Sequence, residues 1–197
     1  MEIIEGSTDE KIVNATFNIL QKEGIEKATT KRIAAEAGVN EITIFRKFKT
    51  KGNLIDVVKE YHLQIFMDKL ENIFDFNEDD EIEEYLRSNF YELLNLSDED
   101  FSIMKIAMEE VREIPDKKLI MTRVTDVVIN KSEEFFLLQK EKGEIRQDVD
   151  ARVLAVMCFE IMFQSVVLWK IYNKSQSVEN ERYGKEIRNI LFNGIKP

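Results

Sequence analysis

The chain has 197 residues, a net charge of −10, one cysteine, one histidine and two prolines. A single cysteine excludes an intrachain disulfide framework and fits a reducing cytoplasm. We expect no metal or cofactor, because the one histidine has no cysteine or second histidine near it in sequence. Glycines that fall mostly at the seams between apolar-periodic segments, with so few prolines, predict an all-α fold of sufficient length for a sizeable core.

The first predicted helix begins after Ser7 and ends at Gly24. Ser7 and Glu10 have the spacing of a capping box, in which each side chain accepts a hydrogen bond from the backbone N–H of the other residue. An apolar stripe that includes Ile12 and Ile19 follows the cap. We expect this helix to brace the segment that comes next.

Two short helical patterns then meet at Gly38. Thr29 can cap the first, and Gly38 stands where a helix most often ends, because glycine enters the left-handed conformation without a Cβ clash. Asn40 is a preferred N-cap for the second, in which Ile44 and Phe48 form one narrow buried stripe. The pattern predicts a helix-turn-helix, whose second helix enters the DNA major groove.

The side chains outside that stripe form a cationic surface. Residues 27 to 51 contain seven Lys or Arg against two Glu, a local balance of +5 in a chain whose total is −10. Such a surface suits DNA, because neutralising phosphates releases counterions, although a solvated helix pair with incidental lysines is the alternative. We expect DNA contacts from Thr30, Lys31, Asn40, Glu41, Ile42, Thr43, Phe45, Arg46, Lys47 and Lys51.

The segment from Lys11 to Val58 contains a series of short motifs. They are Glu23-Gly24, Thr29-Thr30, Ile33-Ala34, Ala37-Gly38-Val39-Asn40, Phe45-Arg46-Lys47-Phe48 and Lys51. Together they resemble the DNA-binding domain of TetR-family transcriptional regulators. The resemblance implies a homodimer that binds a palindromic operator, and a connector helix that moves when a small molecule binds.

Two departures from the family pattern lie on the expected DNA-facing side. Ile42 replaces a residue that is usually small, and Phe45 replaces a usual Tyr and so lacks one hydroxyl for a phosphate. We expect Ile42 to pack on a thymine methyl group, whereas the alternative is an inward position against the first helix. Base reading is expected from Glu41, Ile42 and Thr43, and phosphate contacts from Thr30, Asn40, Lys47 and Lys51.

We expect residues 1–51 to form the DNA-binding domain and residues 52–197 a helical effector-binding and dimerisation domain. The larger part has a net charge of −11 and should repel DNA. Its first helix carries an apolar series from Leu54 to Ile73 that includes Ile65. On the same helix, His62 is expected to be a partly exposed polar residue beside the pocket and not a metal ligand.

Four further helices follow in this larger part. The first buries Ile82, Tyr85, Leu86, Phe90 and Leu93. Ser97 caps the second, in which Phe101, Met104, Met108 and Val111 point inward, and Pro115 stands in the first turn of the third, which Gly143 ends. The fourth, residues 153–172, is apolar almost all round, but Glu160 and Lys170 argue against a membrane span.

The last predicted helix has an apolar stripe of Tyr183, Ile187, Ile190 and Leu191, and ends at Gly194. The family resemblance implies that it forms the homodimer together with residues 153–172. An effector pocket for an apolar or amphipathic molecule is expected among Phe66, Phe90, Met104, Met108, Met121, Met157, Glu160, Phe163 and Gln164, although plain core is the alternative for each Met and Phe.

Two functions therefore follow from the sequence. The first is a DNA-binding, ligand-responsive repressor, and the second is a helical enzyme or apolar-ligand carrier with a vestigial helix-turn-helix. An enzyme has no reason to keep the cationic surface, and the chain offers little for nucleophilic or metal catalysis, whereas paired carboxylates among its 38 acidic residues stay open as an alternative. We therefore expect a regulator and not an enzyme.

Overall fold

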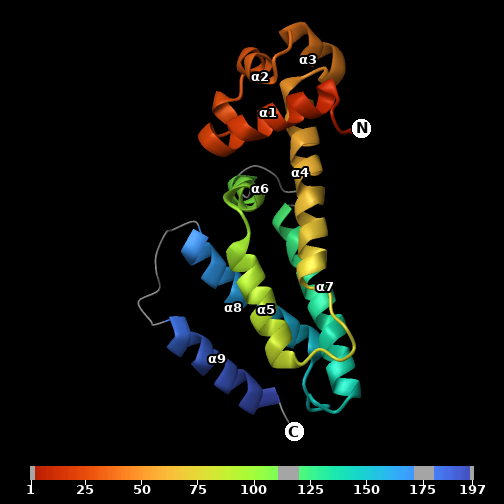
Figure 1. Cartoon of the computed structure of the whole chain (residues 1–197), viewed down its shortest axis with the longest axis vertical. Coiled ribbons are helices and arrows are strands. Elements are labelled where there is room, and N and C mark those ends of the chain that lie inside the picture. The colour runs from red at the N-terminus through yellow and green to blue at the C-terminus, as the bar shows by residue number, and fades with distance from the viewer. Residues whose placement is uncertain (1–2, 111–119, 171–179, 196–197) are drawn as a thin grey trace. The chain divides into compact units, whose positions relative to one another are not determined.

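The computed structural model describes residues 3–110, 120–170 and 180–195, and within them all regular structure is helical (Figure 1). The helices are α1 (Thr8–Glu23), η1 (Ile25–Lys27, a single 3-10 turn), α2 (Thr30–Ala37), α3 (Glu41–Phe48), α4 (Lys51–Ile73), α5 (Ile82–Asn95), α6 (Asp98–Glu110), α7 (Ile120–Glu141), α8 (Ala151–Lys170) and α9 (Asn180–Ile195). The all-α prediction is confirmed.

The chain divides into two compact units. The first contains α1, α2 and α3, the part of α4 up to Phe66 and the part of α6 from Ser102. The second contains the remainder of α4 and α6 together with α5, α7, α8 and α9. The first unit thus extends beyond residue 51, and the functional boundary expected there stays a prediction.

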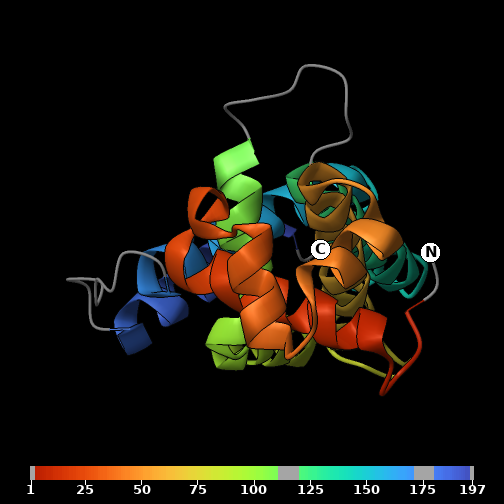
Figure 2. The same cartoon turned by 90° about the horizontal axis from the view of Figure 1, so that it is seen from above.

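Local capping explains where the helices of the first unit begin. The backbone N–H of Glu10 donates to Ser7 Oγ at 3.1 Å, and Glu10 Oε2 accepts from the N–H of Gly6 at 2.6 Å. The Ser7 half of the capping box is confirmed, whereas Glu10 binds the N–H of the residue before the cap. Beyond it, α1 buries Ile12 and Phe17, and its stripe packs on α2 (Figure 2).

The turn between α2 and α3 has the predicted chemistry. Gly38 is left-handed with φ 65° and ψ 35°, and the N–H of Val39 donates to Ala34 O at 2.9 Å, which closes the end of α2. Asn40 Oδ1 then accepts from the N–H of Ile42 at 2.9 Å and starts α3. Ile44 is buried on the inner side of α3, as the sequence predicted.

Not every apolar residue of helix α4 is buried. Ile65 is 38% exposed, whereas Leu63, Phe66 and Leu70 are buried. One residue turns an α-helix by about 100°, so Ile65 lies off the stripe that its neighbours form. The apolar series predicted for this helix includes Ile65 but omits the buried Leu63.

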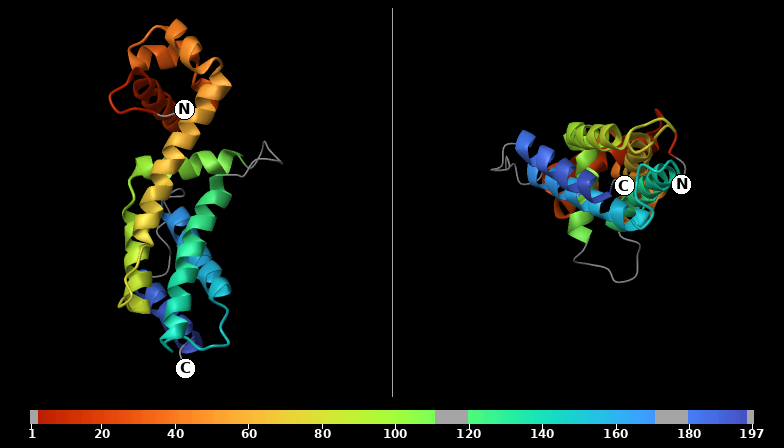
Figure 3. Two further views of the ribbon diagram at one scale, coloured as in Figure 1. Left: turned by 90° about the vertical axis from the view of Figure 1, so that its right-hand side faces the viewer. Right: turned by 90° about the horizontal axis from the view of Figure 1, so that it is seen from below.

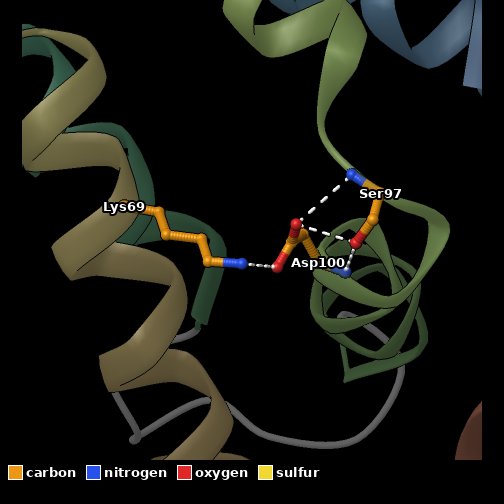
Figure 4. Close-up of polar contacts among 3 residues, drawn as sticks. All are labelled: Lys69, Ser97 and Asp100. Carbon is orange, nitrogen blue, oxygen red and sulfur yellow. Dashed lines mark hydrogen bonds and ion pairs between the residues drawn. The ribbon is translucent and has the colours of Figure 1, made fainter.

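An ion pair fixes the start of α6 in the second unit (Figure 4). Lys69 on α4 pairs with Asp100, whose Oδ2 accepts from the Ser97 N–H at 3.2 Å and from Ser97 Oγ at 2.8 Å. Burial by itself would raise the pKa of Asp100, but the hydrogen bonds from Lys69 and Ser97 outweigh it and lower that pKa. The predicted Ser97 cap is confirmed, since Ser97 Oγ also accepts from the Asp100 N–H at 3.1 Å.

The core of the second unit lies where α7 and α8 run side by side and α5 packs on α8 (Figure 3). Phe135 and Phe136 on α7 are fully buried, and Tyr85 on α5 stacks on Phe135 with ring centroids 3.8 Å apart. Gln139 Nε2 donates to Asp80 O at 3.0 Å and joins α7 to the loop before α5. The aromatic rings therefore form the centre of this unit.

The C-terminal helix ends one residue later than the sequence predicted. α9 passes through Gly194 and ends at Ile195, which is buried and whose carbonyl accepts from the N–H of Arg146 at 2.9 Å. That long-range hydrogen bond holds the last turn past the glycine. The expectations for Val111, Pro115, Leu119 and the side chain of Tyr183 lie outside the described part of the chain.

Candidate DNA-binding face and effector region

Helix α3 presents two large apolar side chains to the outside. Ile42 is 73% exposed and Phe45 is 48% exposed, whereas Ile44 and Phe48 are buried on the opposite side. Ile42 therefore does not take the inward position that the sequence left open. Arg46 is exposed on the same helix, so one side of α3 combines apolar and cationic groups, as a helix in the major groove requires.

A hydrogen bond joins α2 to α3 beneath this face. Thr30 Oγ1 donates to Glu41 Oε1 at 2.5 Å, and both side chains are half-buried. Thr30 was expected to bind phosphate and Glu41 to read a base. In the free protein the two residues bind each other, which fixes the relative position of the two helices of the motif.

Three cations near the motif are held by the protein itself. Lys47 pairs with Asp9 on α1, and Lys51 Nζ donates to Ile25 O at 3.0 Å. Arg32 forms a two-pronged contact with Glu23, and the hydrogen bond from Arg32 lowers the pKa of Glu23. These contacts brace α2, α3 and α4 against α1 and η1, a role that the sequence did not reveal for Lys47 and Lys51.

Other cations remain exposed on this part of the chain. Lys27, Lys31, Arg46 and Lys49 are all exposed. Lys49 follows α3 with φ 68°, and its Nζ donates to Arg46 O at 3.0 Å. Asn40 is also exposed, and Thr43 is half-buried. These side chains are placed to meet a polyanion without first breaking a buried contact.

His62 is half-buried in the first unit, with its ring packed against aromatic neighbours. Its ring stacks on Phe17 with centroids 3.5 Å apart and planes 8° apart, and it meets Tyr61 edge to face at 5.3 Å. Its Nε2 is buried and has no hydrogen-bond partner among the described residues. Burial lowers the pKa of His62 to about 4, so the ring is neutral at pH 7. The expected partial exposure of His62 is confirmed, and the pocket beside it stays a prediction.

The predicted effector residues fall into two groups by exposure. Phe66 and Met104 are buried, and Phe90, Met121 and Phe163 are half-buried. Met157 is 49% exposed, and Glu160 and Gln164 are exposed beside it on α8, although the sequence expectation grouped them with buried residues. The side chain of Met108 lies outside the described part of the structure.

A buried polar cluster in the second unit was missed by the sequence reasoning. Asn89 on α5 is 2% exposed. Asn89 and Ser132 lie beside the Tyr85 hydroxyl, and burial raises the pKa of Tyr85 to about 12. The signal was present, because Asn89 is four residues after Tyr85 and so shares its buried face.

The described residues give little support to a metal site or to a reactive thiol. No group of three or more His, Cys, Asp or Glu side chains there could hold a metal ion. Cys158 is buried, and burial raises the pKa of its thiol to about 12, which keeps it protonated and unreactive. Helix α8 is long and apolar enough to cross a membrane, a property that core helices of soluble proteins share.

The segment that contains the helix-turn-helix matches a known protein family. Residues 12–58 match the family model described as bacterial regulatory proteins, tetR family. The chain belongs to the TetR family. TetR-family proteins are DNA-binding transcriptional regulators and not enzymes, so the regulator reading of the sequence is confirmed in this coarse form.

Two Bacillus subtilis proteins are similar in sequence to this TetR-family chain. An uncharacterised HTH-type transcriptional regulator, YvkB, is 42% identical over 55 residues, which span 28% of this chain and 29% of that protein. The fatty acid metabolism regulator protein is 20% identical over 188 residues, 94% of each chain. The stronger identity is thus confined to a short segment, whereas the full-length likeness is weak.

Solved structures extend the likeness of this TetR-family chain to the whole fold. Salmonella enterica GusR superposes with a TM-score of 0.72 at 19% identity, over 97% of each chain. The fatty acid degradation regulator FadR from Bacillus halodurans superposes with a TM-score of 0.62 at 21% identity, over 98% of each chain. At these identities the superpositions show the fold alone.

Proposed function

We propose that this TetR-family regulator is a homodimeric repressor that binds a palindromic operator and releases it when a small apolar or amphipathic molecule binds. The exposed side of α3 supports the DNA-binding part of this proposal, because Ile42, Phe45 and Arg46 lie outside the core on a braced helix-turn-helix. A cytoplasmic location belongs to the same proposal, since the regulator must reach DNA.

Selection of the purified protein from a random duplex library in moderate salt tests the operator. An enriched palindrome, with half-sites about 34 to 36 Å apart between centres, is expected from twofold symmetry. The half-site would also identify candidate target genes. Retention of duplex without any enriched sequence would contradict specific operator binding by the free protein.

Removal of the Ile42 side chain is expected to relax one position of each half-site. Ile42→Ala removes three carbon atoms from a contact with a thymine methyl group, and burial of such groups is worth about 0.8 kcal/mol per methylene. We therefore expect about a tenfold smaller preference for thymine there, measured by repeating the duplex selection with the variant. Ile65→Ala, the same change at another exposed isoleucine, should leave the selected sequence intact. An unchanged profile for Ile42→Ala would remove Ile42 from base reading.

An exposed stripe on α8 supports the dimer. Val153 and Met157 are 57% and 49% exposed, and Glu160 and Gln164 continue the same stripe at spacings of three and four residues. On α9, Ile190 is 71% exposed. We assign this surface of α8 and α9 to the subunit interface, and with it Met157, Glu160 and Gln164.

A charge in the middle of that stripe is expected to dissociate the dimer. Met157→Asp would place a carboxylate in the apolar contact, and because both subunits carry it, we expect the dimer dissociation constant to rise at least about tenfold. Sedimentation equilibrium measures the change. Leu137→Asp on α7 is the matched control, since Leu137 is exposed to a similar extent, 47%, outside α8 and α9. Equal effects of both variants would place the interface elsewhere.

We infer an apolar effector from half-buried aromatic and thioether side chains in the second unit. Phe90, Met121 and Phe163 are half-buried there, and aromatic and thioether side chains commonly line pockets for apolar ligands. Two of the similar proteins are named as regulators of fatty acid metabolism or degradation, which agrees with an effector of this kind. Titration of the operator complex with medium-chain apolar compounds tests release.

A further inference from the structure

The first residues of α2 and α3 are joined by one hydrogen bond. Thr30 begins α2 and Glu41 begins α3, and Thr30 Oγ1 donates to Glu41 Oε1 at 2.5 Å. Both side chains are half-buried, so water competes only partly for this bond. A threonine hydroxyl has one proton to donate. While Thr30 holds Glu41, it therefore cannot also donate to a phosphate, which is the role that the sequence predicts for it.

The same hydrogen bond leaves part of the Glu41 carboxylate available. A carboxylate accepts at both oxygens and has about four lone-pair sites, so the bond at Oε1 leaves Oε2 able to accept another hydrogen bond. The bond also fixes a side chain that would otherwise sample several rotamers, and this ordering is complete before DNA arrives. Glu41 is thus an oriented hydrogen-bond acceptor at the start of α3.

The start of α3 is also the end of the helix that reads bases in motifs of this kind. In a helix-turn-helix, the N-terminal residues of the second helix contact base edges in the major groove. Glu41 is the first residue of α3, and its neighbour Ile42 is 73% exposed. The segment matched by the family model, residues 12–58, contains both helices. The helix dipole favours a negative charge at this end of α3.

The chemistry of a carboxylate determines which base it can accept from. In the major groove, guanine and thymine present acceptors and no donor, and an acceptor repels a carboxylate. Adenine presents a donor beside its N7 acceptor, a pair that suits the amide of Asn or Gln. Cytosine presents its N4 amino group without an acceptor beside it. Of the four bases, cytosine is therefore the best match for a group that can only accept.

We propose that Thr30 and Glu41 act as one unit, in which Thr30 positions the Glu41 carboxylate to accept from the N4 amino group of a cytosine in each operator half-site. The inference rests on the proposed function, because it names the base that the same DNA-binding surface selects. Thr30 is a positioning residue, which affects DNA binding through Glu41 and not by binding phosphate itself.

Duplex selection with Glu41→Gln tests which base Glu41 contacts. The full-length variant and the unmodified protein are selected in parallel from one random library in moderate salt. The unmodified protein should retain half-sites with cytosine at one position, and the variant should retain adenine there, because an amide both donates and accepts. We expect a preference of about tenfold for cytosine over adenine to become one of about tenfold for adenine. Identical half-sites for both proteins would overturn the proposal.

Glu36→Gln is the matched control for the change in charge. Glu36 is an exposed glutamate on α2, so the control removes the same charge from the same motif. The control should retain cytosine at the position that Glu41→Gln changes. If the control also lost cytosine, net charge and not a contact from Glu41 would set the preference, and the proposal would be wrong.

Variants at residue 30 separate positioning from phosphate binding. Thr30→Val removes the hydroxyl with little change in shape, and it should lower the preference for cytosine at that position about fivefold, because Glu41 then loses rotamer freedom only on binding. Thr30→Ser keeps the hydroxyl and should keep the preference. Circular dichroism shows whether each variant is folded. Weaker binding of Thr30→Val to all duplexes alike, with the cytosine preference intact, would contradict the positioning role.

The selection with the unmodified protein separates this inference from the proposed function. An enriched palindrome without a cytosine position that depends on Glu41 would contradict the inference and leave operator binding intact. The absence of any enriched sequence would contradict both, because no base would then be selected.

Discussion

Operator affinity is expected to fall about a thousandfold when the salt concentration rises from about 50 to about 200 mM. In a dimer, the exposed Lys27, Lys31, Arg46 and Lys49 are each present twice, which allows about six to eight phosphate contacts. Each neutralised phosphate releases counterions, and each contributes about −0.9 to the slope of log K against log salt. Fluorescence anisotropy of a labelled duplex at several salt concentrations gives that slope.

A single variant shows which cations carry this effect. Arg46→Ala removes two contacts per dimer and should make the slope shallower by about 1.8. The control is the double variant Glu23→Ala with Arg32→Ala, which removes a mutually bound exposed pair and no net charge. Its slope should match that of the unmodified protein. If Arg46→Ala left the slope unchanged, Arg46 would not lie against the DNA backbone.

Acidification is expected to lower the free energy of unfolding by about 3 kcal/mol at pH 4 through His62 alone. Burial lowers the pKa of His62 from 6.5 to about 4, so between these values the unfolded chain binds a proton that the folded chain does not. The contribution of neutral His62 to the free energy of unfolding is therefore fully present above pH 6.5 and is lost as the pH falls towards 4. At pH 4 the folded histidine is itself half protonated, so the loss there is about 3 kcal/mol, at about 1.36 kcal/mol for each pKa unit.

His62→Phe isolates this contribution from the carboxylates that titrate in the same range. Phenylalanine can keep the stack on Phe17, and the Nε2 that it removes has no partner among the described residues. Urea unfolding at pH 7 and pH 4 should show the stability difference between variant and unmodified protein growing by about 3 kcal/mol in favour of the variant. A difference independent of pH would mean that His62 becomes charged within the fold.

Features set by neighbours in sequence were predicted well. Ser7, Thr29, Asn40 and Ser97 cap helices because a side-chain oxygen reaches an N–H two or three residues ahead, and Gly38 turns because its conformation is local. The family match confirmed the fold and the class of regulator for the same reason, since these motifs are contiguous.

Features set by tertiary contacts were not predicted. Lys47 and Asp9 are far apart in sequence, and their pairing depends on how α1 crosses α3. Asn89 was overlooked because asparagine is usually exposed, whereas its position on the stripe of Tyr85 outweighs its polarity. Met157 was expected beside the pocket because α8 is apolar on several sides, and only the packing distinguishes its buried side from its exposed one.

The acidic partners of Arg32 and Lys47 have a consequence for how the regulator distributes itself over a genome. A chromosome offers about a million or more competing sites, to which attraction is purely electrostatic. Glu23 and Asp9 already neutralise Arg32 and Lys47, so neither cation adds to that general attraction. The internal pairs therefore reduce the fraction of protein held on irrelevant DNA and leave more of it for the operator.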